Sequence, residues 1–199
     1  MLAVAREAAT REGVPVAWLL GRAESLPFAD GSFDLVLCQQ ALQFFADRRA
    51  ALAEMRRVLA LDGRLGLGVW EGLDRHPFYR TLHETIERRL GMSGVEEIFA
   101  LGDAGELREL LEGAGFERVE IEPVSITARF PDPEGFLAGE IDVDTAAIPS
   151  MQHLDDDARR AITEAIRGDM QASLDEVTEG DHVVLPFYSY IVRAARESR

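Results

Sequence analysis

The sequence is poor in cysteine, in basic residues and in long apolar runs. Its one cysteine, Cys38, excludes an internal disulfide and a cysteine-based zinc site, and suits a reducing compartment. The 36 acidic residues outnumber the 21 Lys and Arg residues, and the formal net charge of −15 disfavours binding to DNA, RNA or an anionic membrane. We find no apolar run of about eighteen residues and no signal peptide, so we expect a cytoplasmic protein.

Metal-binding and phosphate-binding motifs are also missing. His83, His153 and His182 are scattered, without the H-x-x-x-H spacing of a metal site, and we predict no metal. The acidic run 155–157 lacks the alternating ligands and turn glycine of a calcium loop, and suits a helix N-terminus instead. No G-x-G-x-G loop joins a predicted strand to a predicted helix. The nearest likeness, the glycines of 66–68, lies inside a predicted strand, where glycine suits close packing. A nicotinamide-dependent dehydrogenase is therefore a weak hypothesis.

What is present suits one globular domain spanning residues 1–199. Hydrophobic residues make up 47% and charged residues 29% of the chain, as in soluble domains that bury a good core. Residues 1–12 predict a helix ended by Gly13, because small apolar residues share one of its faces. Residues 14–20 predict a short strand.

The stretch from Ala23 to Trp70 organises the rest of the chain. Residues 33–38 (FDLVLC) form a short apolar run after a turn, which predicts a strand buried in a parallel sheet. Apolar residues at helical spacing then follow Asp47, a residue suited to N-cap a helix, and residues 64–70 predict a second strand. Strand, helix and strand with short links predict a βαβ unit with a right-handed crossover.

This stretch resembles the second half of the cofactor domain of class I S-adenosylmethionine-dependent methyltransferases. The ordered segments LPFADGSFDLVLCQQALQFF and RRVLALDGRLGL carry the resemblance, which is greatest to the small-molecule branch that includes the ubiquinone/menaquinone C-methyltransferases. It implies an α/β, Rossmann-like sheet of order 3-2-1-4-5-7-6 with an antiparallel last strand. It also implies S-adenosylmethionine as the cofactor and a small-molecule methyl acceptor as the partner.

The resemblance further implies that part of the family fold would lie upstream of Met1, which looks like an internal methionine. The family's first strand, Gly-rich loop and ribose-binding acidic residue have no counterpart here, so we expect the sheet to lack its first two strands. We therefore expect the chain as numbered to bind S-adenosylmethionine weakly or not at all. We also expect aggregation or a homodimer through the freed edge of strand 33–38.

Five strands are predicted, near residues 14–20, 33–38, 64–70, 117–129 and 183–194. The first should be detached or slide in beside strand 33–38. A one-residue phase slip of the apolar pattern at Pro123–Val124 predicts a bulge or bend there. Residues 131–180 predict a helical insertion between the last two strands, with one long amphipathic helix over 154–174 that Gly168 weakens. By resemblance, this insertion helps to cover the substrate.

Nine residues are candidates for the site, all through their positions in the family pattern. For cofactor binding they are Arg22, Ala23, Glu24, Cys38, Gln39 and Gln40, and for substrate binding Gln43, Phe44 and Trp70. The last three cofactor candidates end a strand, and ligands sit at the carboxyl ends of strands in such sheets. No catalytic residue is predicted, because in-line methyl transfer depends mainly on positioning and on the exclusion of water.

Several of these residues have plainer interpretations. Arg22 stands where the family commonly has Asp, and a donor-only guanidinium cannot accept from the adenine amino group. Glu24 could substitute for that Asp, or be an ordinary exposed loop residue. Cys38 suits a small buried hydrophobe, and Trp70, near His76 and Tyr79, suits packing as well as a pocket wall. Gln43 suits solvent and Phe44 the core.

Two function hypotheses follow from different classes. The first is a methyltransferase acting on a small molecule. The second is a non-catalytic remnant or partner-completed module that has lost cofactor binding, motivated by the missing Gly-rich loop and by the departures at Arg22 and at residues 61–63. The sequence identifies neither the methyl acceptor nor the accepting atom.

Overall fold

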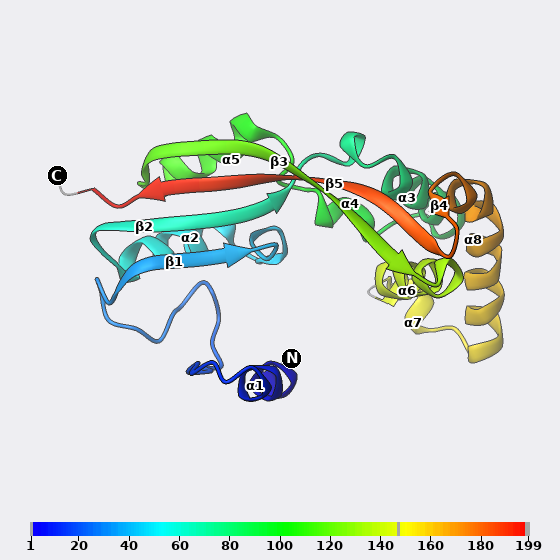
Figure 1. The fold of residues 1–199 in the computed structure, drawn as a ribbon, viewed down its shortest axis with the longest axis horizontal. Helices are drawn as coiled ribbons and strands as arrows, with labels where there is room; N and C mark the ends of the chain where they lie inside the picture. Colours follow the sequence, from blue (N-terminus) through cyan, green and yellow to red (C-terminus); the bar gives the residue numbers. More distant parts are fainter. Residues whose placement is uncertain (1, 147, 198–199) are drawn as a thin grey trace.

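The computed structural model of the protein describes residues 2–146 and 148–197 and is built on one mixed sheet (Figure 1). Its strands are β1 (Phe33–Gln39), β2 (Leu59–Trp70), β3 (Glu117–Pro131), the short β4 (Thr178–Glu179) and β5 (His182–Ala195). The order is β1-β2-β5-β3, and β4 pairs with β5. β1 and β2 are parallel and joined by a helix, whereas β5 is antiparallel to both β2 and β3. The predicted βαβ unit and antiparallel last strand are thus confirmed, and the order matches 4-5-7-6 of the family sheet.

The helical segments of the described residues include long helices and single turns. They are α1 (Leu2–Arg11), η1 (Leu42–Phe44), α2 (Arg48–Val58), η2 (Leu73–Arg75), α3 (Pro77–Leu90), α4 (Val95–Ile98), α5 (Ala104–Gly113), α6 (Pro133–Ala146), α7 (Pro149–Gln152) and α8 (Asp156–Glu176). Asp47, Asp103 and Asp155 each cap a helix by accepting from a backbone N–H three residues later, at 2.8–2.9 Å. α8 continues through Gly168, because one glycine costs only about 1 kcal/mol in a helix held by packing.

Two apolar cores lie on opposite faces of the sheet, and β5 contributes to both. The first packs α2 and α5 against one face, with Leu52, Leu67 and Val192 among its buried side chains. The second packs α3, α6 and α8 against the other face at one end, where the beginning of β5 supplies Leu185 and Phe187. Elsewhere on this second face apolar side chains stay exposed.

The predicted bulge at Pro123–Val124 is wrong. Both residues pair in regular register with β5, and the register shift lies earlier, between Glu117 and Glu120, where Arg118 has a φ of +49°. The apolar pattern changes phase because the helices that cover β3 change face. Val119 belongs to the core under α5, whereas Phe130 packs on the opposite face against the core of α3, α6 and α8.

The strand predicted at residues 14–20 is also wrong. These residues form no strand and pair with no strand of the described chain, so they lie apart from the sheet and do not pair with β1. Val14, Val16, Leu19 and Leu20 are all exposed, and every residue of α1 is exposed or half-buried. Figure 1 shows α1 apart from the sheet.

The segment before β1 is held to α2 by ion pairs and hydrogen bonds. Glu54 accepts from the backbone N–H of Leu26 at 2.8 Å, and Arg57 donates to the carbonyl of Phe28 and to the carboxylate of Asp30. The hydrogen bond from Arg57 lowers the pKa of Glu54 to about 2. These contacts fix where the chain enters β1. None of the helices in the described residues has the length and apolar character needed to span a bilayer.

Candidate functional site

The carboxyl ends of β1 and β2 lie side by side and bring several of the predicted site residues together. Gln40 follows β1 with a φ of +47°, a left-handed conformation that is uncommon outside glycine. Its backbone N–H donates to the carbonyl of Gly68 at 2.8 Å, which fixes the chain at this turn. Strain of this kind clusters at ligand sites because the surrounding structure has to hold it in place.

A cavity of about 550 Å³ opens on the sheet beside these strand ends. Cys38, Gln39, Gln40 and Trp70, four of the nine predicted residues, line it. Strands β3 and β5 complete the wall with residues that the sequence analysis did not single out: Val124, Ile126, Phe187, Ser189 and Ile191. The alternation of β5 could have indicated which of its residues face the cavity, but not that they meet the end of β1.

The amide side chains near this end of β1 are incompletely paired. Gln40 Nε2 lies 3.4 Å from Ser189 Oγ, and Gln40 Oε1 is buried without a partner among the described residues. Gln43, in η1, is 1% exposed, and neither amide atom finds a partner within that part of the chain. Gln43 is therefore not a solvent residue, while Phe44 beside it is 52% exposed and is not a core residue.

The loop with Arg22, Ala23 and Glu24 lies against the segment that follows η1. Hydrogen bonds from backbone N–H groups, its own first and then those of Asp47 and Ala46, lower the pKa of Glu24. Its carboxylate also lies 3.4 Å from the largely exposed guanidinium of Arg22. Glu24 is thus held by its own loop and by the segment that follows η1 rather than freely exposed.

Cys38 lines the cavity and also belongs to the apolar core beneath α2. It is 8% exposed and packs in the core beneath α2, and burial raises the pKa of its thiol. A buried thiol of raised pKa is a poor nucleophile. The side chain therefore contributes packing to the wall of the cavity.

Trp70 lies where β2 ends and contacts Phe187, with 5.2 Å between ring centroids. His76 behind it is 2% exposed, its Nδ1 lies 3.1 Å from the carbonyl of Gly72, and its Nε2 accepts from the backbone N–H of Tyr188 at 3.1 Å. These partners suit the neutral ring, and burial lowers its pKa. Tyr79 is buried in the core of α3, α6 and α8, so both residues support the site from behind.

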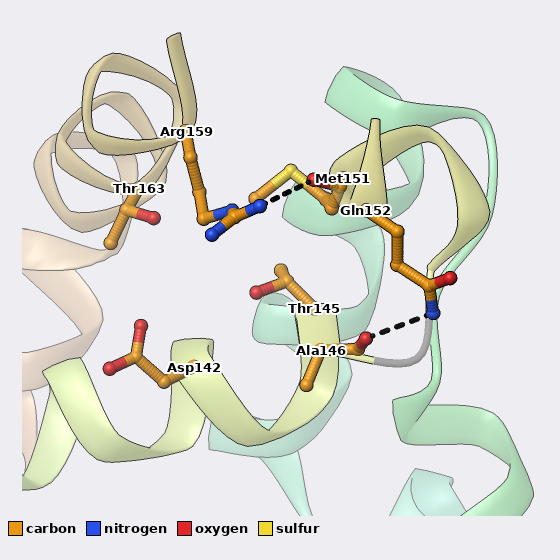
Figure 2. Close-up of a pocket in the computed structure, with 7 residues that line it drawn as sticks. All are labelled: Asp142, Thr145, Ala146, Met151, Gln152, Arg159 and Thr163. Carbon is orange, nitrogen blue, oxygen red and sulfur yellow. Dashed lines mark hydrogen bonds between the residues drawn. The ribbon is translucent and has the colours of Figure 1, made fainter. Parts of the chain in front are cut away.

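A second cavity, of about 310 Å³, lies among α6, α7 and α8 (Figure 2). Asp142, Thr163 and Arg159 project towards it, and Arg159 donates to the carbonyl of Met151 at 3.3 Å. Its residues are remote from the strand ends in the chain, and no predicted site residue lines it. In the described residues no three metal-ligating side chains gather, and the predicted absence of a metal stays a prediction.

Most of the similar known proteins are methyltransferases. Residues 1–67 match a family model described as a methyltransferase domain. A methyltransferase structure from Bacillus halodurans superposes over 99% of this chain and 79% of its own, with a TM-score of 0.58 and 20% identity. The first third of the chain thus matches a methyltransferase family model, and nearly the whole chain shares the fold of this methyltransferase structure.

Curated relatives match parts of the chain. The methyltransferase YcgJ of Bacillus subtilis is 48% identical over 65 residues, which are 32% of this chain and 26% of that protein. The ubiquinone/menaquinone biosynthesis C-methyltransferase of Cupriavidus metallidurans is 34% identical over 134 residues, covering 60% of this chain and 54% of that protein. The chain spans about half or less of these relatives.

Proposed function

We propose that the chain takes part in S-adenosylmethionine-dependent methyl transfer to a small-molecule acceptor. The observation that supports this most is the set of amide atoms after β1 that are unpaired within the described residues: Oε1 of Gln40, which lines the cavity, and both amide atoms of Gln43 in η1. Buried polar groups without partners are costly, so their presence at a strand end favours a ligand that pairs with them. Among the described residues, Gln40 and Gln43 are the groups that fit such a cofactor.

In this proposal the chain's own residues position the two reactants and exclude water, rather than acting as acids or bases. The cofactor, when bound, provides an electrophilic methyl group on a sulfonium. Gln40 is fixed by its backbone hydrogen bond to Gly68, so its amide has a defined place for a polar ligand atom. Trp70 and Phe187 form an apolar wall that keeps water from the reacting atoms. Holding two reactants in line without water is the main requirement of this reaction.

Ligand-observed saturation-transfer NMR tests cofactor binding even when the affinity is millimolar. S-Adenosylhomocysteine is added to the monodisperse chain, and NADH serves as the comparison ligand. We expect saturation transfer to the adenine protons of S-adenosylhomocysteine and to its CH2 protons next to the sulfur. This transfer should be weaker in the Gln43→Ala variant. Transfer to NADH alone, or to neither ligand at millimolar concentration, would contradict the proposal. Tritiated methyl transfer to a set of acceptor classes then identifies the acceptor.

A further inference from the structure

Residues 14–20, with the sequence VPVAWLL, form an uncharged apolar segment that stands in solvent. Six of these seven residues are exposed, and the seventh, Trp18, is half-buried. Contiguous apolar surface of this kind is uncommon on a monomeric protein and marks a surface that contacts a partner. We call residues 14–20 the arm.

The edge of β1 is open to a further strand. β2 is the one strand that pairs with β1 within the described residues, so the other edge of β1 leaves backbone N–H and C=O groups without a ladder (Figure 1). Edge strands commonly avoid further pairing through lysine, proline or very short length. β1 has seven residues, contains neither lysine nor proline, and carries one charge, on Asp34. Its side chains Phe33, Leu35 and Leu37 are exposed.

The arm and the edge of β1 match in length and in backbone chemistry. Each has seven residues, so the two span the same distance when both are extended. Pro15 has no N–H and fits an outer strand only where its nitrogen faces away from the ladder. Backbone N–H groups of successive residues in a strand point to opposite sides. The N–H of Val16 would therefore point to the ladder, and that of Ala17 would point to solvent.

The structure keeps the arm away from β1 of its own chain. A turn closes directly after the arm, where the N–H of Ser25 donates to the carbonyl of Arg22 at 3.2 Å. The next residue, Leu26, is fixed to Glu54 of α2 by a hydrogen bond of 2.8 Å. Beyond this turn the arm pairs with no strand of the described chain. A second copy offers the same open edge without this tether.

The charge of the chain also favours this contact between two copies. A formal net charge of −15 makes two copies repel each other over most of their surfaces. The arm carries no charge and β1 carries only Asp34, so repulsion is least where these two segments meet.

We propose that the arm of one copy adds as an outer strand to the β1 edge of a second copy, and that the reciprocal exchange closes a two-fold symmetric dimer. Addition of an extended segment to a sheet edge is a general mode of recognition, in which the backbone ladder supplies affinity. Reciprocal exchange uses the same two surfaces on both copies and leaves neither arm free. The dimer does not depend on the proposed function.

Two proline variants of the full chain test the ladder by sedimentation equilibrium over a range of concentrations. Val16→Pro removes an N–H that points to the ladder, whereas Ala17→Pro, the matched control, removes one that points to solvent. Both positions are exposed in the monomer, so its fold does not depend on them. We expect Val16→Pro to raise the dimer dissociation constant roughly five- to a hundredfold, because both arms lose a hydrogen bond. Ala17→Pro should change it by no more than about twofold.

Cross-linking tests which surfaces meet. In a Cys38→Ala background, copies with Val16→Cys are mixed with isotope-labelled copies with Leu35→Cys and treated with a short bismaleimide. Mass spectrometry should detect the mixed dimer. Copies with Ile126→Cys in place of Leu35→Cys, at an exposed position on β3, should give only background amounts.

A chain that stays monomeric at millimolar concentration would overturn the proposal. Equal effects of the two proline variants would also overturn it, because the contact would then not be a ladder of the expected side. Cross-links between two Leu35→Cys copies in preference to mixed ones would assign the edge to direct pairing of two β1 strands instead. A chain with both cysteines that cross-links only within itself would show that the arm pairs with its own β1.

Discussion

Asp144 provides the sharpest test of the energetics, because its carboxyl is buried in the helical part of the fold. It lies on α6, is 4% exposed, and its Oδ2 has no partner within the described residues. Burial, followed by repulsion from Glu140 one turn earlier, raises its pKa from 3.8 to about 7. Burial also raises the pKa of Glu140, whose carboxyl interacts with Tyr79. The ionised form of Asp144 is therefore destabilised by the fold.

The direction of the pH dependence follows from proton binding. Between about pH 4 and pH 7 the folded protein holds the Asp144 proton while the unfolded chain releases it. Stability from this group is therefore complete below pH 4 and is lost as the pH rises towards 7. A pKa raised from 3.8 to about 7 corresponds to a loss of about 4 kcal/mol at pH 8, as an order of magnitude.

Asp144→Asn keeps the shape of the side chain and removes the charge. We expect it to stabilise the protein at pH 8 by about 2–4 kcal/mol and at pH 4.5 by no more than about 1 kcal/mol. Urea unfolding followed by circular dichroism at both pH values measures the difference. Asp142→Asn, at an exposed position of the same helix, is the matched control. A gain from Asp144→Asn that is equal at the two pH values would refute the reasoning.

Three further perturbations test other parts of the structure. The pKa of His76 is lowered from 6.5 by burial, so the contribution of this residue to stability should decrease as the pH drops below 6.5. His76→Phe should remove this pH dependence in urea titrations. It should also cost about 1–3 kcal/mol of stability at pH 8, because the N–H of Tyr188 loses its acceptor. Gln43→Ala should reduce saturation transfer from the protein to S-adenosylhomocysteine more than it reduces stability, whereas Val36→Ala should cost about 1–3 kcal/mol of stability and leave the transfer unchanged. We propose that the free edge of β1 mediates self-association, so Leu37→Lys, at a side chain that is 72% exposed, should shift sedimentation-velocity profiles towards monomer; an unchanged profile of a self-associating chain would exclude this edge.

The central βαβ unit was predictable because its signals are local. The apolar run before Cys38, the capping carboxylate of Asp47 and the helical spacing of α2 each act within a few residues. The start of β2 was less predictable. The chain passes from Val58 directly into the strand at Leu59, and the Asp62–Gly63 turn signal falls inside the strand.

The site was predictable in part for the same reason. Gln40 follows a strand that the sequence marks clearly, and the carboxyl ends of parallel strands meet at one edge. Ser189 was not predictable, because it joins the site only through pairing across 149 positions with Gln40. A serine in an alternating strand carries no sign of which distant side chain it will meet.

The two errors in the fold share one cause, which is that a strand is a property of the sheet rather than of its segment. Residues 14–20 have the apolar, β-favouring composition of a strand, yet in the described chain no neighbour offers them a ladder, and Leu20 is 89% exposed. In β3, two helical layers cover opposite faces of the strand at its two ends. The apolar pattern therefore changes phase although Pro123–Val124 keeps regular register with β5. The apolar pattern of a strand therefore indicates which face is covered at each position. One face of β3 is covered by helices at Phe130 but uncovered at Ile126, which is 64% exposed and lines the cavity. The uncovered stretch lies beside the carboxyl ends of β1 and β2, where the cavity opens.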